Sequence, residues 1–206
     1  MAAGRYHMND VVRMSPPLQP EAIRRLSVGQ GILLSGSIIT ARDAAHRYLV
    51  EAGPHEAPPV DLAGAIIYHC GPVIAGTGDQ RRVVSAGPTT SMRMEMYEQR
   101  LIEKYRIGAI IGKGGMGPAT ERALVAVGTV YLAAPSGAGA LLARRIKRVV
   151  SVWKLEEFGS PEALWQLEVE DFPAVVAIDA KGGSLYREVA EKSRQALSRL
   201  LAPAEK

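Results

Sequence analysis

The sequence contains a single cysteine, Cys70, among its 206 residues. One thiol cannot form an intramolecular disulfide, and by itself it cannot build a zinc or iron–sulfur site. Such sparse use of cysteine fits a protein of a reducing compartment, and we expect a cytoplasmic location. Because Cys70 lies in an apolar segment, we predict that it is a core residue. No residue of this chain is predicted to ligate a metal.

Aromatic residues and net charge are also low. Phe, Trp and Tyr together make up 5% of the sequence, and the formal net charge is +4. Surfaces that bind nucleic acid usually combine basic patches with exposed aromatic side chains. The basic residues at 144–148 are therefore better interpreted as a solvated face, and we predict no nucleic-acid partner. A small anionic substrate would suit the mild positive charge.

No segment has the composition of a signal peptide or a membrane span. The N-terminal residues MAAGRYHMNDVV lack the apolar core of a secretory signal. The uncharged stretch 124–143 contains Pro135, Ser136 and three glycines, so it predicts several short elements joined by turns. We therefore expect a soluble protein with no membrane partner.

Strand-like apolar runs alternate with helix-like runs along the chain. Continuous apolar runs predict buried strands, and apolar residues spaced towards one face predict helices. The expected strands are residues 31–39, 63–70, 107–111, 129–134, 149–155 and 175–179, and the expected helices are residues 41–52, 90–105, 119–127, 138–145 and 185–201. This alternation predicts an α/β fold with a central mixed sheet flanked by helices. We expect an irregular N-terminal arm at residues 1–18 and a single domain at 19–202.

The glycine-rich segment 112–117, GKGGMG, matches the dinucleotide-binding pattern G-x-G-x-x-G. That function also needs an acidic residue about 20 positions further on, and no acid occurs between Glu121 and Glu156. A P-loop is excluded too, because Gly114 follows Lys113 where Ser or Thr is required. A lysine in such a turn still favours an anion, since backbone N–H groups and the next helix N-terminus carry partial positive charge. The alternative is a flexible turn with a solvated lysine.

The segment 85–94, SAGPTTSMRM, places two hydroxyls and a guanidinium behind a Gly-Pro turn. Arg93 follows Thr89 by four residues, so both side chains can face one site if a helix begins near Thr90. The planar guanidinium suits bidentate binding of a carboxylate. Two alternatives stay open on the residues alone: Thr89 as a helix N-cap, and Arg42 as a surface partner of nearby polar groups.

Four segments in order carry a family resemblance: TARDAAH at 40–46, SAGPTTSMRM at 85–94, IIGKGGMG at 110–117 and LWQLEVEDFPAVVAID at 164–179. Together they resemble the β subunit of the two-subunit class I fumarate hydratases and of the related L-tartrate dehydratases. The same unit forms the C-terminal domain of single-chain class I fumarases. The resemblance runs from about residue 17 to residue 186 and implies a swivelling β/β/α domain.

The resemblance implies a hydro-lyase that reversibly hydrates fumarate to L-malate, with L-tartrate dehydration as the alternative. An oxygen-sensitive [4Fe–4S] cluster is expected, ligated by three cysteines of a larger α subunit and not by this chain. We expect the two subunits to form an α2β2 heterotetramer that is inactive without the α subunit. A non-catalytic domain that binds an anion or a partner protein is a further alternative.

The resemblance also implies roles for individual residues. Thr89 is expected to transfer a proton, and Lys113 to place a positive charge beside the developing carbanion or carboxylate. The expected substrate-binding residues are Arg42, Arg93, Thr90 and Gly87, and the expected supporting residues are His46, Gly112 and Gly114. The chain has Glu95 where family members usually have Asp, which could change the geometry of the site or its substrate preference.

Overall fold

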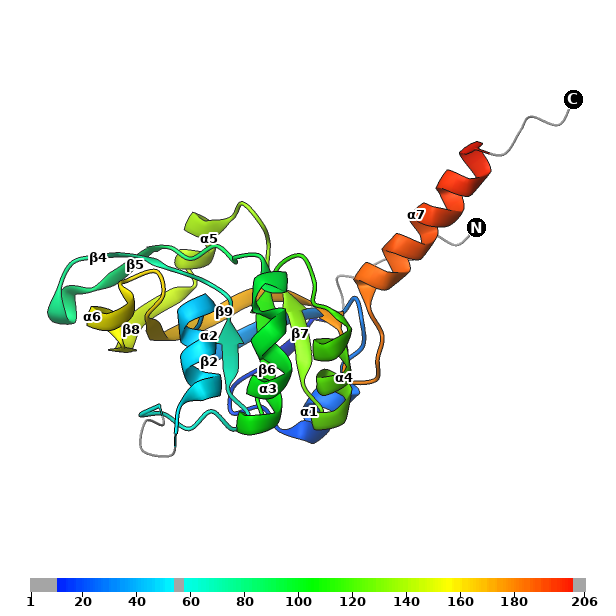
Figure 1. Ribbon diagram of the computed structural model, residues 1–206. Coiled ribbons are helices and arrows are strands. Elements are labelled where there is room, and N and C mark those ends of the chain that lie inside the picture. The colour runs from blue at the N-terminus through cyan, green and yellow to red at the C-terminus, as the bar shows by residue number, and fades with distance from the viewer. Residues whose placement is uncertain (1–10, 54–57, 202–206) are drawn as a thin grey trace, which may run out of the picture.

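A computed structural model describes residues 11–53 and 58–201. Figure 1 shows its elements. The strands are β1 (Val12–Met14), β2 (Gly31–Thr40), β3 (Ile66–Tyr68), β4 (Val73–Ala75), β5 (Arg82–Ser85), β6 (Ala109–Gly112), β7 (Val130–Ala133), β8 (Ile146–Trp153) and β9 (Leu164–Ile178). The helices are α1 (Pro20–Arg25), α2 (Asp43–Glu51), α3 (Glu95–Tyr105), α4 (Pro118–Val127), α5 (Gly139–Ala143), α6 (Leu155–Phe158) and α7 (Leu185–Leu201), with short 3₁₀ helices η2 (Gly78–Gln80) and η3 (Ser91–Met94).

Seven strands form one mixed sheet in the order β1-β2-β3-β6-β7-β9-β8. The first five are parallel to their neighbours, whereas β9 runs antiparallel to β2, β7 and β8. Because β9 pairs with both β2 and β7, the strands β2, β3, β6, β7 and β9 close into a ring. The predicted α/β fold with a central mixed sheet is confirmed.

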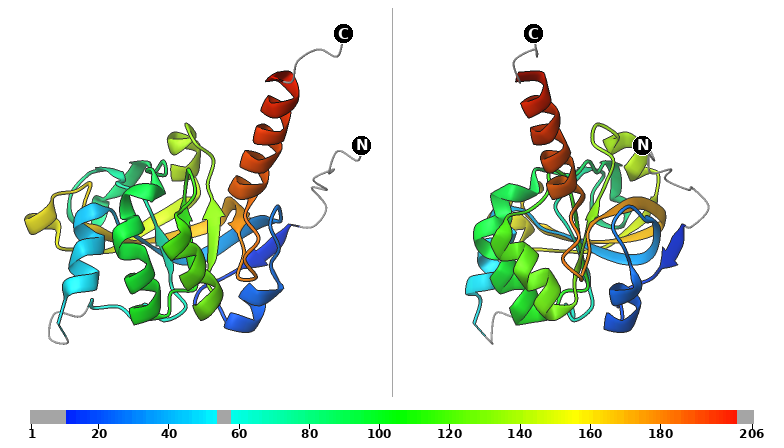
Figure 2. Two further views of the ribbon diagram at one scale, coloured as in Figure 1. Left: turned by 45° about the vertical axis from the view of Figure 1, so that its right-hand side comes forward. Right: turned by 90° about the vertical axis from the view of Figure 1, so that its right-hand side faces the viewer.

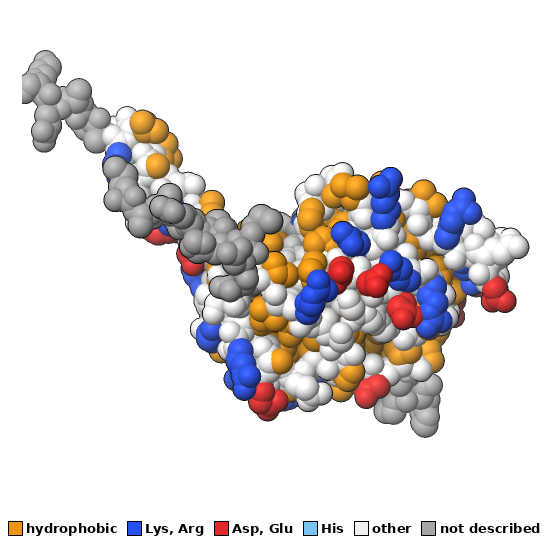
Figure 3. Space-filling view, turned by 180° about the vertical axis from the view of Figure 1, so that it is seen from behind, with side chains coloured by type: hydrophobic (Ala, Val, Ile, Leu, Met, Phe, Trp, Pro, Cys, Tyr) orange, Lys and Arg blue, Asp and Glu red, His pale blue; other side chains and the backbone are white. Residues whose placement is uncertain are grey.

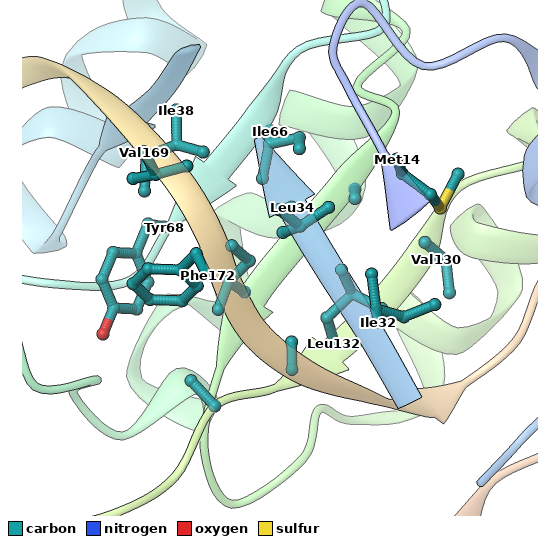
Figure 4. Close-up of a cluster of buried hydrophobic side chains, with 14 of the residues drawn as sticks. Met14, Ile32, Leu34, Ile38, Ile66, Tyr68, Val130, Leu132, Val169 and Phe172 are labelled. Atoms are coloured by element: carbon teal, nitrogen blue, oxygen red, sulfur yellow. The ribbon is translucent and has the colours of Figure 1, made fainter. Parts of the chain in front are cut away.

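Alternating side chains of these strands divide the core into two parts. Leu34, Ile66 and Tyr68 belong to the cluster enclosed by the strands, where Figure 4 shows them beside side chains from β7 and β9. Ile67 and Ile110, which are sequence neighbours of such residues, pack in a second cluster with the helices. Both faces of these strands are therefore buried, which explains their continuous apolar sequences.

Helices α2, α3 and α4 lie side by side on one face of the sheet (Figures 1 and 2). The second core cluster fills the space between them and the strands. Helix α7 instead extends away from the body and has no buried residue (Figure 1). None of the helices within 11–53 and 58–201 combines the length and apolarity needed to span a membrane.

Several elements differ from the sequence-based expectations, and three of them bear on the sheet and the site. Residues 12–14 add a strand to the sheet where an irregular arm was expected, while residues 1–10 lie outside the described residues. The helix expected at 90–105 begins as η3 and becomes α-helical only from Glu95. The strand expected at 175–179 is the end of the 15-residue β9. Its first part alternates buried and exposed side chains, a period-two pattern that a search for apolar runs overlooks.

Candidate active site

Three parallel strands bring the candidate residues to one edge of the sheet. Arg42 follows β2 as the N-cap residue of α2, His69 follows β3, and Lys113 follows β6. The carboxyl ends of neighbouring parallel strands lie at the same edge, which is where α/β folds usually bind ligands. The sequence segments around residues 42 and 113 therefore meet in space.

The segment that carries Thr89 is held to this edge by main-chain hydrogen bonds. Thr89 N donates to the His69 carbonyl oxygen at 2.7 Å, and Ser91 N donates to the Lys113 carbonyl oxygen at 3.0 Å. Thr90 and Lys113 also form an isolated parallel bridge. The structure thus brings Thr89 and Thr90, from the segment 85–94, together with Lys113, from the segment 110–117.

The hydroxyls of Thr89 and Thr90 are not used as helix caps. Thr90 is the residue before η3, and its side chain makes no capping hydrogen bond. Thr89 is half-buried and Thr90 is exposed. Since neither hydroxyl is hydrogen-bonded to another described residue, the capping alternative for Thr89 finds no support and both groups are available to a ligand.

The two candidate arginines each contact a carboxylate. Arg42 Nε lies 3.3 Å from Glu162 Oε1, and the Glu162 carboxylate also accepts a hydrogen bond from Ala44 N at 2.9 Å. Arg93 forms an ion pair with Asp43, the first residue of α2. Both guanidinium groups therefore lie near the N-terminus of α2, and each is already in contact with the kind of group that a dicarboxylate would offer.

Lys113 differs from both arginines because its ammonium group has no partner among the described residues. The residue is half-buried and is followed by Gly114 and Gly115, whose φ angles are 81° and 79°. Glycine adopts such positive φ values without steric cost, so the GKGG sequence shapes the loop that presents the lysine. A half-buried cation without a counter-charge is a candidate binding point for an anion.

Gly112 and Gly87, two of the three candidate glycines, differ in how strictly they are required. A Cβ atom on Gly112 would lie 1.9 Å from Ser91 Oγ, which makes any side chain there impossible without displacing Ser91. A Cβ atom on Gly87 would lie 3.5 Å from Gly139 Cα, an ordinary contact. Space therefore dictates glycine at 112 and does not dictate it at 87.

Beneath this edge lies a buried polar cluster that the sequence analysis recognised only in part. His46 of α2, His69 and Glu98 of α3 are fully buried. Glu98 Oε2 lies 3.2 Å from His46 Nε2 and 3.0 Å from His69 Nε2. The other ring nitrogen of His46 is 2.8 Å from the Arg42 carbonyl oxygen, and that of His69 is 2.9 Å from Ser91 Oγ. The cluster thus contacts the segments that carry the candidate residues.

Mutual interactions shift the pKa values within this cluster. Burial acts to raise the pKa of Glu98, but the adjacent His69 and His46 outweigh it and lower that pKa to about 2. Burial acts to lower the pKa of His46, but Glu98 and the Arg42 carbonyl raise it above its ordinary value. For His69, burial prevails over the attraction of Glu98 and the pKa is lowered.

Cys70 is fully buried, as predicted, and burial raises the pKa of its thiol to about 12. Iron–sulfur clusters are held by several cysteine thiolates. A single, neutral, buried thiol does not fit that role, and Cys70 is the one cysteine of the sequence.

Glu95, which stands where the family pattern usually has Asp, caps helix α4. Its carboxylate accepts hydrogen bonds from Gly117 N at 2.8 Å, Ala119 N at 3.2 Å and the Thr120 hydroxyl at 2.7 Å. These contacts satisfy free N–H groups at the start of α4 and place negative charge at its positive end. Glu95 is therefore committed to the fold.

The basic residues at 144–148 lie among acidic ones. Lys147 pairs with Glu170 and Arg148 with Glu168, between the neighbouring strands β8 and β9, and all four side chains are exposed. Figure 3 shows the face behind that of Figure 1, where Lys and Arg side chains alternate with Asp and Glu. This mixture agrees with a solvated face rather than a continuous basic patch.

Comparison with known families identifies the chain. The family model "Fumarase C-terminus" matches residues 3–189. The chain belongs to this family. A fumarase C-terminus relative, "Putative fumarate hydratase class I" of Geobacillus stearothermophilus, is 45% identical over 94% of the chain, which spans only 37% of that protein.

Two relatives have nearly the length of this chain. "Putative L(+)-tartrate dehydratase subunit beta" of Methanocaldococcus jannaschii is 45% identical over 89% of the chain and 95% of the relative. "L(+)-tartrate dehydratase subunit beta" of Escherichia coli is 38% identical over 85% of the chain and 86% of the relative. The relatives of this fumarase C-terminus chain are thus hydro-lyases or their subunits, and both substrate names occur among them.

Proposed function

We propose that this chain is the β subunit of a hydro-lyase that interconverts fumarate and L-malate. The observation that carries the proposal is the edge described above. The backbone of Lys113 is bridged to that of Thr90, and among the described residues neither the Lys113 ammonium nor the hydroxyls of Thr89 and Thr90 has a partner. Two arginines that already contact carboxylates lie on the adjoining segments. A second candidate is L-tartrate dehydration, favoured by the names of the relatives that this chain covers almost completely.

The arginines would bind the two carboxylates of the substrate. Arg93 has 47% of its side chain exposed, whereas Arg42 has 22%, so the pair between Arg93 and Asp43 is the easier one to exchange. A substrate carboxylate would replace Asp43 on Arg93, whose planar guanidinium can bind both carboxylate oxygens. Arg42 would keep Glu162 as an anchor and offer its remaining N–H donors.

Lys113 and Thr89 would act at the carbon from which the proton is removed. Removing a proton next to a carboxylate builds up negative charge, and a fixed ammonium group stabilises it. The Thr89 hydroxyl would transfer the proton, although a hydroxyl is a weak base unless a neighbouring charge assists it. Lys113 is that neighbour, because the backbone bridge between residues 90 and 113 holds the two loops together.

We further propose that a larger α subunit holds the [4Fe–4S] cluster that activates the substrate hydroxyl. The support is the family resemblance together with the single buried cysteine of this chain. Met92 and Met96, which flank Arg93 on the chain, are exposed, as is Leu141 of α5. Such apolar side chains near a polar site are typical of a surface that a partner covers. An α2β2 assembly in the cytoplasm completes this proposal.

The test is an anaerobic assay with the cluster-bearing subunit from the same source. L-malate and L-tartrate are supplied in separate runs, and fumarate absorbance or oxaloacetate formation is followed. Turnover only when both chains are present supports the proposal, and the ratio of kcat/KM for the two substrates decides between them. A formed complex with an intact cluster and no turnover of either substrate would refute both candidates.

A further inference from the structure

The Glu98 carboxylate is enclosed in a way that requires a compensating charge. It is fully buried, and neither of its oxygens has a well-formed hydrogen bond within the part of the chain that the structure describes. A buried carboxylate without compensation is strongly unfavourable. Among the described residues, its close polar neighbours are the Nε2 atoms of His46 and His69. One of these imidazoles must therefore carry the balancing positive charge, or Glu98 must be protonated.

The neighbours of His46 identify it as the cation. Its Nδ1 atom faces the carbonyl oxygen of Arg42, which can only accept a hydrogen bond. Its Nε2 atom faces the Glu98 carboxylate. Both ring nitrogens therefore need a proton, and an imidazole with two protons is an imidazolium. The raised pKa of His46 and the low pKa of Glu98 agree with this assignment.

The neighbours of His69 assign it the neutral form. Ser91 Oγ already accepts hydrogen bonds from Lys113 N at 3.2 Å and from the Tyr131 hydroxyl at 2.8 Å. The Ser91 proton is then free to be donated to His69 Nδ1, so this ring needs a proton only on Nε2, towards Glu98. The lowered pKa of His69 agrees with a neutral ring.

We propose that His46, Glu98, His69 and Ser91 form one proton-ordered network that positions the substrate-facing residues. The network ends on the main chain of the site: on the Arg42 carbonyl through His46, and on Lys113 N through Ser91. His69 also accepts the hydrogen bond of Thr89 N with its own carbonyl oxygen. The four residues are positioning residues. Their part in catalysis rests on the proposed function. The assignment of a positive charge to His46 and a neutral ring to His69 does not depend on it.

The main alternative is a buried metal ion. The three ligand atoms lie within 4.8 Å of one another, and two imidazoles with one carboxylate are a common ligand set. A divalent cation with one carboxylate would leave a net positive charge in the core, close to Arg42, whereas the proton network is neutral. No fourth His, Cys, Asp or Glu of residues 11–53 and 58–201 joins the group. The charge balance and the small number of ligands therefore favour a network of protons over a bound metal ion.

The charge assignment is tested by NMR of the full chain labelled with ¹⁵N-histidine, without a partner. At pH 8 we expect one histidine, absent in His46→Gln, with both ring nitrogens in the imidazolium range. A second, absent in His69→Gln, should show a neutral ring protonated at Nε2. If either variant fails to fold, through-bond correlation to the backbone amides assigns the signals instead. In Glu98→Gln the His46 ring should become neutral at this pH.

Other charges near the cluster must be separated from the effect of Glu98. Asp43 acts on both imidazoles and Arg42 lies beside His46, so Asp43→Asn serves as a control and should leave the imidazolium signature in place. A neutral His46 ring in the unmodified chain at pH 8 would overturn the proposal. The proposal would also be overturned if the purified chain contained one equivalent of a transition metal and its removal by a chelator changed the spectra of both histidines.

The positioning role is tested in the complex with the α subunit. Glu98→Gln should lower kcat by about 10²-fold and change KM by a smaller factor. The reason is that a small displacement of the reacting groups lowers the rate by about that factor. Glu98→Asp should recover part of the rate, and Glu103→Gln, on the exposed face of the same helix, should not affect it. Wild-type kcat in Glu98→Gln, with the imidazolium lost, would refute the positioning role. An inactive unmodified complex would refute the proposed function and leave the NMR result standing.

Discussion

The exposed edge of the site and the cluster beneath it use charge in opposite ways. At the edge, the Lys113 ammonium has no partner in the part of the chain that the structure describes, and Arg93 shares an exposed pair with Asp43. In the cluster, the ring nitrogens of His46 and His69 each face a specific atom and no solvent. The comparison teaches that the groups proposed to bind a ligand are incompletely paired, while the groups proposed to fix their positions are paired with one another.

The largest effect is expected from removing a group of the edge. Lys113→Ala should lower kcat by about 10²–10³-fold, the usual cost of removing one stabilising charge or donor. Thr89→Ala should also abolish most turnover. Since both residues are partly exposed, the free energy of unfolding of each variant should differ from that of the unmodified chain by no more than roughly 0.5 kcal/mol. Steady-state kinetics and denaturant unfolding check this, with Lys192→Ala on α7 as a charge-matched control. Near-normal rates in both variants would contradict the site assignment.

Gly112→Ala should break the link between edge and cluster. The added methyl group would lie 1.9 Å from Ser91 Oγ, and relieving such a clash costs about 1–3 kcal/mol of stability or more. Gly87→Ala is the matched control, because its methyl group meets only an ordinary contact at 3.5 Å. Urea unfolding of both variants measures the difference. Equal stabilities would show that Ser91 moves without cost and that the network is loosely held.

Glu95→Ala should affect the fold and leave substrate choice unchanged. Loss of a capping side chain costs about 0.5–2 kcal/mol, and here it frees N–H groups at the start of α4. Glu95→Gln keeps one acceptor oxygen and should therefore lose less stability than Glu95→Ala. The ratio of kcat/KM for L-malate and L-tartrate should not change in either variant. A change in that ratio would show that residue 95 reaches the substrate after all.

The pH dependence of stability should separate the two histidines. Because the folded-state pKa of His69 is lowered, the unfolded chain takes up its proton first, so stability falls as the pH drops below about 6.5. His46 has a raised pKa, so its contribution is complete below about 6.5 and is lost only as the pH rises from there through the higher folded-state pKa. Glu98 adds stability that persists above its unfolded pKa and disappears towards pH 2.

Chemical unfolding of the unmodified chain and of His69→Gln at pH 7.5, 6 and 5 measures these contributions. The variant should lose less stability than the unmodified chain between the first and last values. A steeper loss in the variant would contradict the neutral state of His69.

The smallest effect is expected from Asp43→Asn. Exposed ion pairs contribute at most about 1 kcal/mol, so freeing Arg93 should lower KM by no more than about fivefold. An increase in KM would mean that Asp43 orients Arg93 for the substrate. Initial rates over a range of substrate concentrations distinguish the two outcomes.

Sequence patterns singled out residues that the structure places at the edge and missed most of the cluster, for a physical reason. Thr89, Arg93 and Lys113 lie in short segments whose neighbours, a Gly-Pro turn and a glycine-rich loop, are themselves distinctive. The contact between His69 and Glu98 joins a strand end to a helix and has no local pattern. One signal was available, because Glu98 shares the buried face of α3 with Leu101 and Ile102, where an acidic residue is unusual.

The same reasoning explains the fold. Strands with both faces buried, such as residues 109–112, are continuous apolar runs and were predicted. Most of β9 was not, since the exposed Glu170 and the half-buried Gln166 and Glu168 interrupt its apolar residues. The ion pair of Arg42 with Glu162 could not be inferred from the sequence, because it depends on the path that brings the segment before β9 close to the start of α2.

Ring closure by β9 has a consequence for biosynthesis. The strand pairs Val175 with Gly31, so two segments from near opposite ends of the chain must meet before the sheet is complete. Contacts of such long range form slowly, and a chain emerging from the ribosome reaches β9 after every other strand of the sheet. Until then the facing edges of β2 and β7 remain open, and open edges invite pairing between chains. Premature termination before residue 164 should therefore yield aggregated protein rather than a smaller functional domain.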